Sequence, residues 1–211
     1  MEIKPVKWYK SLIFKVNWII ILILIVFISI LGWSINEIAS EEISDQVTEV
    51  NLEIAKSLNT NVNNFLDNSE DIINLTASFL DHHLNNDQEI LELLKQVKKE
   101  YSIFKYIYFA DNNGKMLIHP EVSLSNDYNP RKRNWYQKAA NNKKLVWTDS
   151  YLDANNRYLM ITVALPIQNE KGDILGVLAG DILLNEFSSA ITNKKVGKTG
   201  YAYITNQKGE I

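Results

Sequence analysis

The chain has 211 residues, of which 46% are hydrophobic and 22% are charged, and its formal net charge is −3. This length suits one sizeable domain with additional segments, and the composition is typical of a globular protein. The negative charge argues against a general nucleic-acid binder. The chain has no cysteine, which excludes disulfides, thiolate metal sites and cysteine nucleophiles.

The first predicted element is an apolar helix near the N-terminus. Residues 16–36 carry no charge, and at a helical rise of about 1.5 Å per residue they span roughly 30 Å, the thickness of the bilayer hydrocarbon. Trp18 and Trp33 stand near its ends, where indoles favour the membrane interface. Lysines precede it and acidic residues follow it: Lys4, Lys7, Lys10 and Lys15, then Glu37, Glu41, Glu42, Asp45, Glu49 and Glu53. We therefore predict a transmembrane helix at 16–36 in the cell membrane, with residues 1–15 in the cytoplasm and the remainder outside.

A cleaved signal peptide is the competing interpretation of this segment. Its apolar region would be about 7–15 residues long and would be followed by a small-residue cleavage site. The apolar run is longer than that, and residues 37–40, Glu-Ile-Ala-Ser, are a poor cleavage site. The sequence therefore favours an uncleaved anchor.

A long amphipathic helix is predicted next, over 36–80. No Pro or Gly occurs between Gly32 and Gly114, and apolar or small residues recur at steps of three and four: Ile43, Val47, Val50, Ile54, Leu58, Val62, Phe65, Ile72, Thr76 and Phe79. This stripe fits either a helix that faces the domain core or the seam of a parallel dimer. Four asparagines between 59 and 64 interrupt the pattern and weaken a strict coiled-coil interpretation.

The central part of the chain predicts an α+β domain. We expect helices at 87–99 and 134–141, and a loop over 121–132. Strands are predicted at 104–110 and 115–119, joined by an Asp-Asn-Asn-Gly turn, and at 146–148, 158–166 and 174–184. This order favours an antiparallel sheet with helices packed on it.

The last segment predicts the beginning of a second, similar sheet. After Phe187 we expect a short helix, and residues 197–211 form an aromatic strand and turn that resemble 107–117. Because the chain stops inside this turn, we interpret it as a fragment.

Little in the sequence indicates catalysis or a cofactor. His82, His83 and His119 form no metal-ligand pattern and are expected to be solvated or capping residues. No phosphate loop, dinucleotide fingerprint or nucleophile motif is present. We therefore predict that the protein is not an enzyme and that it has no cofactor and no metal.

Residues 128–136, Tyr-Asn-Pro-Arg-Lys-Arg-Asn-Trp-Tyr, form the most distinctive cluster. Two of the three arginines of the chain lie here, and the planar fork of arginine binds a carboxylate through two hydrogen bonds, which lysine cannot do. Asp181 falls within an apolar run and needs a cation or a donor as partner. The residues alone leave two interpretations open: an internal Arg–Asp bridge or a ligand site.

Residues 36–211 resemble the extracytoplasmic double-Cache sensor domains of prokaryotic chemoreceptors, histidine kinases and diguanylate cyclases. The resemblance implies that 37–187 contain the long helix and a membrane-distal, PAS-like Cache module. It also implies that 188–211 begin an incomplete membrane-proximal module. Members of that family carry a second transmembrane helix and a cytoplasmic output domain.

The chain resembles most the subfamily that binds free amino acids. That subfamily has Tyr, four residues, Arg, one residue and Trp-Tyr, followed by a distant Tyr and a distant Asp. The residues that match here are Tyr128, Arg133, Trp135, Tyr136, Tyr151 and Asp181, and Asp153 matches a further acidic position. The resemblance implies that Arg133 binds the ligand carboxylate, assisted by Tyr128 and Trp135. It further implies that Asp181 binds the ammonium, assisted by Tyr151 and Asp153.

The resemblance therefore implies an amino-acid sensor of a membrane-anchored signal transducer, with chemotaxis as the expected output and a homodimer formed through the long helix. Two alternatives stay open. One is a sensor of another small carboxylate or amine in a histidine kinase or diguanylate cyclase, and the other is a ligand-free dimerisation module. Residues expected to select the ligand side chain are Tyr106, Tyr108 and residues 115–127.

Overall fold

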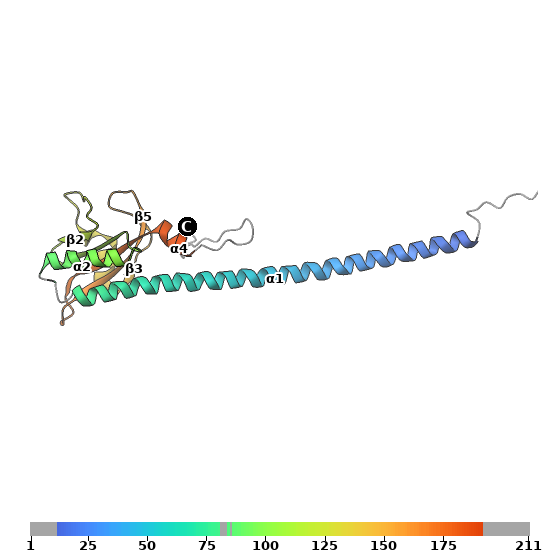
Figure 1. Ribbon diagram of the computed structural model, residues 1–211, viewed down its shortest axis with the longest axis horizontal. Coiled ribbons are helices and arrows are strands. Elements are labelled where there is room, and N and C mark those ends of the chain that lie inside the picture. Colours follow the sequence, from blue (N-terminus) through green and yellow to red (C-terminus); the bar gives the residue numbers. More distant parts are fainter. Residues whose placement is uncertain (1–11, 81–83, 85, 192–211) are drawn as a thin grey trace, which may run out of the picture. The chain divides into compact units, whose positions relative to one another are not determined.

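The computed structural model describes residues 12–80, 84 and 86–191, and the chain divides into two units, 1–55 and 56–211. Figure 1 shows the elements along the chain. In chain order they are α1 (Leu12–Leu80), α2 (Asp87–Glu100), β1 (Tyr106–Asp111), β2 (Met116–His119), the 3-10 turn η2 (Pro130–Lys132), α3 (Asn134–Asn142), β3 (Val146–Trp147), β4 (Tyr151–Leu152), β5 (Leu159–Gln168), β6 (Ile174–Leu183) and α4 (Leu184–Ile191).

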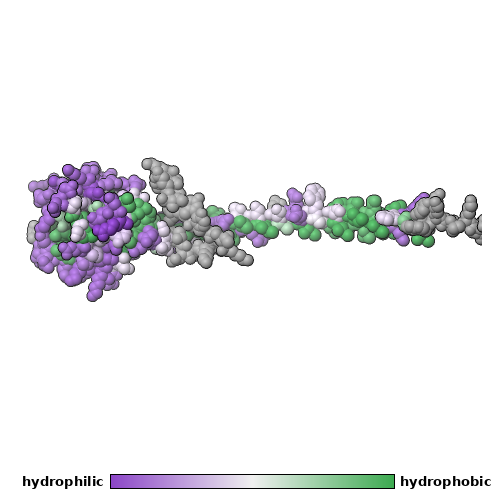
Figure 2. Space-filling view, turned by 90° about the horizontal axis from the view of Figure 1, so that it is seen from above, coloured by the Kyte–Doolittle hydropathy of each residue, from purple (hydrophilic) through white to green (hydrophobic). Residues whose placement is uncertain are grey.

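The first unit consists of the N-terminal part of α1. Its most apolar 18-residue window has a mean hydropathy of 2.8, and none of that window is buried. Figure 2 shows the apolar surface that this segment presents. Within the described residues, α1 is the one helix that is long and apolar enough to cross a membrane. The predicted apolar helix is present, and it is consistent with membrane anchoring.

The second unit contains an antiparallel sheet in the order β2-β1-β6-β5-β3, with β4 paired to β5. The β1–β2 hairpin closes through the predicted turn, in which Asp111 accepts hydrogen bonds from the backbone N–H groups of Asn113 and Lys115. The chain then returns so that β6 pairs with both β1 and β5. This α+β arrangement of a long helix followed by an antiparallel sheet is the one predicted.

One face of the sheet is covered by the C-terminal part of α1, from residue 56, together with α2. Ile73, Leu80 and Leu94 from these helices join Ile107, Leu178 and other strand residues in one hydrophobic cluster. The core-facing interpretation of the stripe is therefore confirmed for Leu58, Val62, Phe65 and Ile72, which all contact or belong to this cluster.

The predicted stripe is wrong at its last position. Phe79 is 53% exposed, whereas Leu80 is fully buried. The buried positions of α1 continue from Thr76 by a step of four residues, and four residues is the spacing at which side chains share a helix face.

The opposite face of the sheet carries α3, η2 and the loop that follows β2. A second cluster lies here, formed around Tyr108, Trp135 and Ala179. The contacts differ from face to face because neighbouring residues of each strand point to opposite sides. Accordingly, Ile107 and Phe109 pack against the helices, and Tyr106 and Tyr108 face α3 and its loop.

Two short elements were absent from the sequence prediction, namely η2 and β4. The helix expected after Phe187 begins earlier, at Leu184, and the Phe187 ring packs on Phe65 with ring centroids 5.1 Å apart. Residues 192–211, on which the prediction of a second sheet rests, lie outside the described residues, as do His82 and His83.

Candidate functional site

Asp181 lies near the end of β6, in the middle of a row of polar side chains that crosses the sheet. It pairs in register with Tyr106 on β1 and with Thr162 on β5, so all three side chains emerge on the same face. Its Oδ1 atom accepts three hydrogen bonds: from the Thr162 hydroxyl at 2.6 Å, the Tyr108 hydroxyl at 2.7 Å and the Tyr151 hydroxyl at 3.2 Å. Three strands thus fix the orientation of one carboxylate.

Burial dominates the electrostatics of Asp181. The side chain is 7% exposed, and removal from water raises its pKa to about 6, although the three hydroxyl donors and the charge of Arg133 oppose the rise. The second carboxylate oxygen, Oδ2, has no hydrogen-bond partner among the described residues. Every buried side-chain oxygen among the described residues has a hydrogen-bond partner. Since Oδ2 has none, it is not buried, and it is accessible from the pocket described below.

Arg133 is held at the junction of η2 and α3. Its backbone caps both elements, and its side chain makes no capping hydrogen bond. The guanidinium carbon lies 5.9 Å from the centre of the Tyr128 ring and 5.8 Å from that of Tyr151, within the range of a cation–π contact. The salt bridges of the described residues do not include Arg133. Its N–H donors therefore point into the pocket without a carboxylate partner.

Trp135 forms the floor beneath this cation. The indole is 2% exposed, and its ring centroid lies 4.9 Å from that of Tyr108 in an edge-to-face contact. Tyr136 supports it from behind, with ring centroids 5.6 Å apart, and donates its hydroxyl to the Asp111 carbonyl oxygen. Tyr136 was predicted to bind ligand. It does not line the pocket, because the residue after Trp135 projects from a different side of α3.

Asp153 lies at the edge of the pocket, where it also holds a turn together. Its Oδ1 atom accepts hydrogen bonds from the backbone N–H groups of Arg157 and Tyr158. The carboxylate is therefore buried with a partner inside the protein, and only its other oxygen is available to a ligand.

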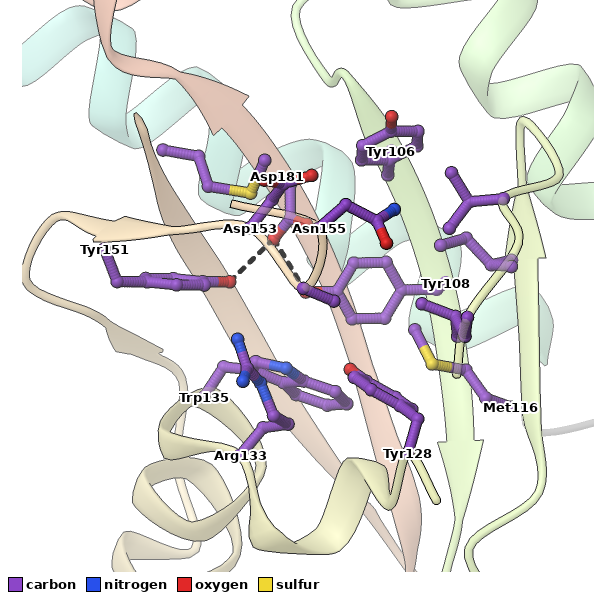
Figure 3. Close-up of a pocket in the computed structure, with 15 residues that line it drawn as sticks. Tyr106, Tyr108, Met116, Tyr128, Arg133, Trp135, Tyr151, Asp153, Asn155 and Asp181 are labelled. Atoms are coloured by element: carbon purple, nitrogen blue, oxygen red, sulfur yellow. Dashed lines mark hydrogen bonds between the residues drawn. The ribbon is translucent and has the colours of Figure 1, made fainter. Parts of the chain in front are cut away.

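These residues surround one narrow pocket (Figure 3). Its cavity volume is about 30 Å³, room for roughly two water molecules. Polar and aromatic residues of the predicted set line it: Tyr128, Arg133, Trp135, Tyr151, Asp153 and Asp181. The expected specificity residues Tyr106 and Tyr108 line it as well, as do Met116, Ile118, Val122 and Leu124 from the 115–127 segment.

Sequence reasoning missed four residues at this site. Thr162 supplies the shortest hydrogen bond to Asp181, and Ala154, Asn155 and Met160 line the pocket. Thr162 had a usable signal, because it is a polar residue inside the apolar run of β5 directly opposite an aspartate. Ala154 and Asn155 had none, because they belong to a loop whose path depends on the turn at Asp153.

The arrangement is suited to binding a small molecule with two opposite charges. One cation, Arg133, and two carboxylates, Asp153 and Asp181, line the same pocket, and Arg133 forms a salt bridge with neither of them. Among the described residues no group of histidine, aspartate and glutamate side chains could hold a metal ion.

Residues 35–211 match the Cache domain family, dCache_1. The chain belongs to this family. Cache sensor domains of chemoreceptors are non-catalytic and extracytoplasmic, and the curated relatives of this Cache protein are methyl-accepting chemotaxis proteins. McpB of Bacillus subtilis is 29% identical over 96% of this chain and 31% of its own length. PctB of Pseudomonas aeruginosa is 30% identical over 81% of this chain and 26% of its own length. The chain thus spans about a third or less of the relatives it matches.

Solved structures with this Cache fold are ligand-binding domains of amino-acid chemoreceptors. The PctB domain from Pseudomonas aeruginosa in complex with L-Gln has a TM-score of 0.64 and 28% identity, and the match covers 71% of this chain and 60% of that one. The PctC domain from the same species in complex with GABA has a TM-score of 0.61 and 25% identity, and the match covers 67% and 66%. These similarities identify the chain as a ligand-binding domain of the chemoreceptor type.

Proposed function

We propose that this domain senses a free amino acid outside the cell and that it belongs to a membrane-anchored chemoreceptor. Arg133 binds the α-carboxylate with help from Tyr128 and Trp135. Asp181 binds the α-ammonium with help from Tyr151 and the remaining oxygen of Asp153. The observation that carries this proposal is that Arg133 and Asp181 line one pocket and yet form no ion pair with each other.

Electrostatics favours a zwitterion over other ligands. An unpaired charge that is removed from water is costly, and the cost is offset only when a partner of opposite sign is brought to it. A molecule with both charges satisfies Arg133 and Asp181 at the same time. A carboxylate alone leaves Asp181 without a partner, and an amine alone leaves Arg133 without one. The alternative of an internal Arg133–Asp181 bridge lacks support, because the described salt bridges do not include this pair.

The geometry also suits the two ends of an amino acid. The Arg133 guanidinium offers a planar set of donors that matches a carboxylate. Asp181 and the tyrosine hydroxyls around it are acceptors in a pocket that contains no second cation among its lining residues. Figure 3 shows Arg133 and Trp135 on one side of the pocket and Asp181 with its hydroxyl donors on another.

The rest of the proposal concerns the whole chain. The segment 16–36 anchors the protein, residues 1–15 are cytoplasmic, and the module over 37–187 is membrane-distal. Residues 188–211 begin a membrane-proximal module, and two chains associate through the long helix. Ligand binding shifts the domain toward a signalling conformation that an output region reads for chemotaxis. The similarity to methyl-accepting chemotaxis proteins supports this assignment.

Isothermal titration of the purified chain in detergent with each of the twenty amino acids tests the proposal. We expect at least one of them to bind. The Arg133→Ala variant should lower the affinity for that amino acid at least about 50-fold, because charge-assisted hydrogen bonds are lost. Arg131→Ala is the matched control, because the Arg131 guanidinium donates to the Asn112 carbonyl oxygen outside the pocket. No binding by any amino acid, or equal effects of the two variants, would contradict the proposal.

A further inference from the structure

The part of the pocket that is not needed for the two charged ends of a ligand is mostly apolar and carries no charge. Once the residues proposed to bind the carboxylate and ammonium are set aside, six apolar side chains remain, Met116, Ile118, Val122, Leu124, Ala154 and Met160, together with the uncharged polar residues Tyr106, Tyr108 and Asn155. The apolar side chains come from β2, from the loop after it, from the loop after β4 and from β5. Figure 3 shows Met116 across the pocket from Tyr151 and Arg133.

Local sequence explains why this wall is apolar. In residues 121–125, Glu-Val-Ser-Leu-Ser, the polar residues are exposed, whereas Val122 and Leu124 are half-buried and line the pocket. This alternation is that of an extended segment with one face toward the protein. Ile118 is positioned by β2, where it pairs in register with Tyr108, another lining residue.

The polar groups that remain near this wall are uncharged. The Asn155 side chain lies between the loops, with its amide nitrogen 3.5 Å from the Ser123 carbonyl oxygen. Lys105 lies over the Tyr106 and Tyr158 rings, 5.8 Å and 5.0 Å from their centres, and it does not line the pocket. The charged lining residues Arg133, Asp153 and Asp181 are assigned to the two charged ends of the ligand. A charged ligand side chain would therefore lose water without gaining a further partner of opposite sign.

We infer that the ligand is an amino acid with an uncharged, aliphatic side chain, and that Ile118, Val122 and Leu124 determine this specificity. The inference rests on the proposed amino-acid binding and adds the class of side chain. The narrow cavity points the same way, because compact aliphatic groups need the least displacement of its walls.

Titration of the purified chain with alanine, valine, leucine, isoleucine and methionine, and in parallel with aspartate, glutamate, lysine and arginine, tests the inference. We expect the tightest aliphatic ligand to bind at least about tenfold more tightly than any charged amino acid. Tightest binding by a charged amino acid would overturn the inference and leave the proposed function intact. No binding by any amino acid would overturn both.

Two variants test the role of the apolar lining residues. Leu124→Ala should lower the affinity for leucine about tenfold and the affinity for alanine less than twofold, because only the larger ligand side chain reaches Leu124. Leu152→Ala is the matched control, because Leu152 is 50% exposed and does not line the pocket. A general loss of folding would weaken both ligands equally, so the ratio of the two affinities separates specificity from stability. An unchanged ratio in Leu124→Ala would overturn the assignment of that residue.

Discussion

Asp181 is the residue of the pocket whose raised pKa brings its titration close to neutrality. Burial raises its pKa to about 6, so the carboxylate is mostly ionised at pH 7.5 and mostly protonated at pH 5. An ammonium group binds the ionised form, whereas the ligand's own two charges do not change over this range. We therefore expect ligand affinity to fall roughly tenfold between pH 7.5 and pH 5, as measured by isothermal titration at both values. Asp181→Asn should abolish this dependence, and Asp149→Asn, which changes an exposed residue, should keep it.

Thr162 lowers the pKa of Asp181 through a hydrogen bond. Its hydroxyl donates a 2.6 Å hydrogen bond to Asp181, and this bond lowers the pKa of the carboxyl. Thr162→Val keeps the shape of the side chain and removes the donor, so the pKa of Asp181 should rise further. The midpoint of the affinity–pH curve should consequently move to a higher pH than in the parent protein. A midpoint that stays in place would show that Thr162 does not stabilise the ionised carboxylate.

The predictability of the site from sequence differs from residue to residue. Arg133, Trp135 and Tyr128 form a compact motif with unusual residue types, so one short segment was enough to name them as candidates, and all three line the pocket. Asp181 was recognisable as an acid in an apolar run, and the resemblance named its partner Tyr151. Tyr108 and Thr162 were not named as its partners, because strand register brings them to it. Tyr136 shared the motif and lies behind the pocket wall, since adjacent helix positions point in different directions.

The packing of β6 against the core requires a glycine at position 180. A methyl group added at Gly180 would lie 2.5 Å from the Phe104 ring, on the helix-covered face of the sheet. Gly180→Ala should therefore lower the free energy of unfolding by about 1–3 kcal/mol through overpacking, measurable by denaturant titration. Ligand affinity should stay within about twofold, because the added group points away from the pocket. Ser150 is exposed, so Ser150→Ala should leave the free energy of unfolding within about 0.5 kcal/mol of that of the parent protein.

Long periodic elements were predictable, whereas the short elements η2 and β4 were missed. The strands β5 and β6 and the helix α2 have enough residues to display their patterns, and Asn86 caps α2 through hydrogen bonds from the N–H groups of Gln88 and Glu89. β4 has two residues and is defined only by its pairing with β5. The residues of β4 show no alternation of their own, so the loop that closes the pocket could not be traced from sequence.

At the scale of the whole molecule, membrane topology is the prediction to test. The chain has no cysteine, so single cysteines report their own accessibility. In intact cells, a membrane-impermeant thiol reagent should label Asp149→Cys and should not label Lys10→Cys until the membrane is permeabilised. The reverse pattern would contradict the proposed orientation, and loss of the protein from the membrane fraction would contradict anchoring by 16–36.

The central claim is that one pocket binds both charges of an amino acid, and it is tested most directly by dividing the ligand into its halves. Isothermal titration should compare the best amino acid with its deaminated acid and its decarboxylated amine, which for leucine are 4-methylpentanoate and 3-methylbutylamine. We expect each half to bind at least about 100-fold more weakly than the intact amino acid, because each leaves Arg133 or Asp181 unpaired. Binding of the acid alone with the affinity of the amino acid, strengthened further by Asp181→Asn, would contradict the claim and identify a carboxylate sensor.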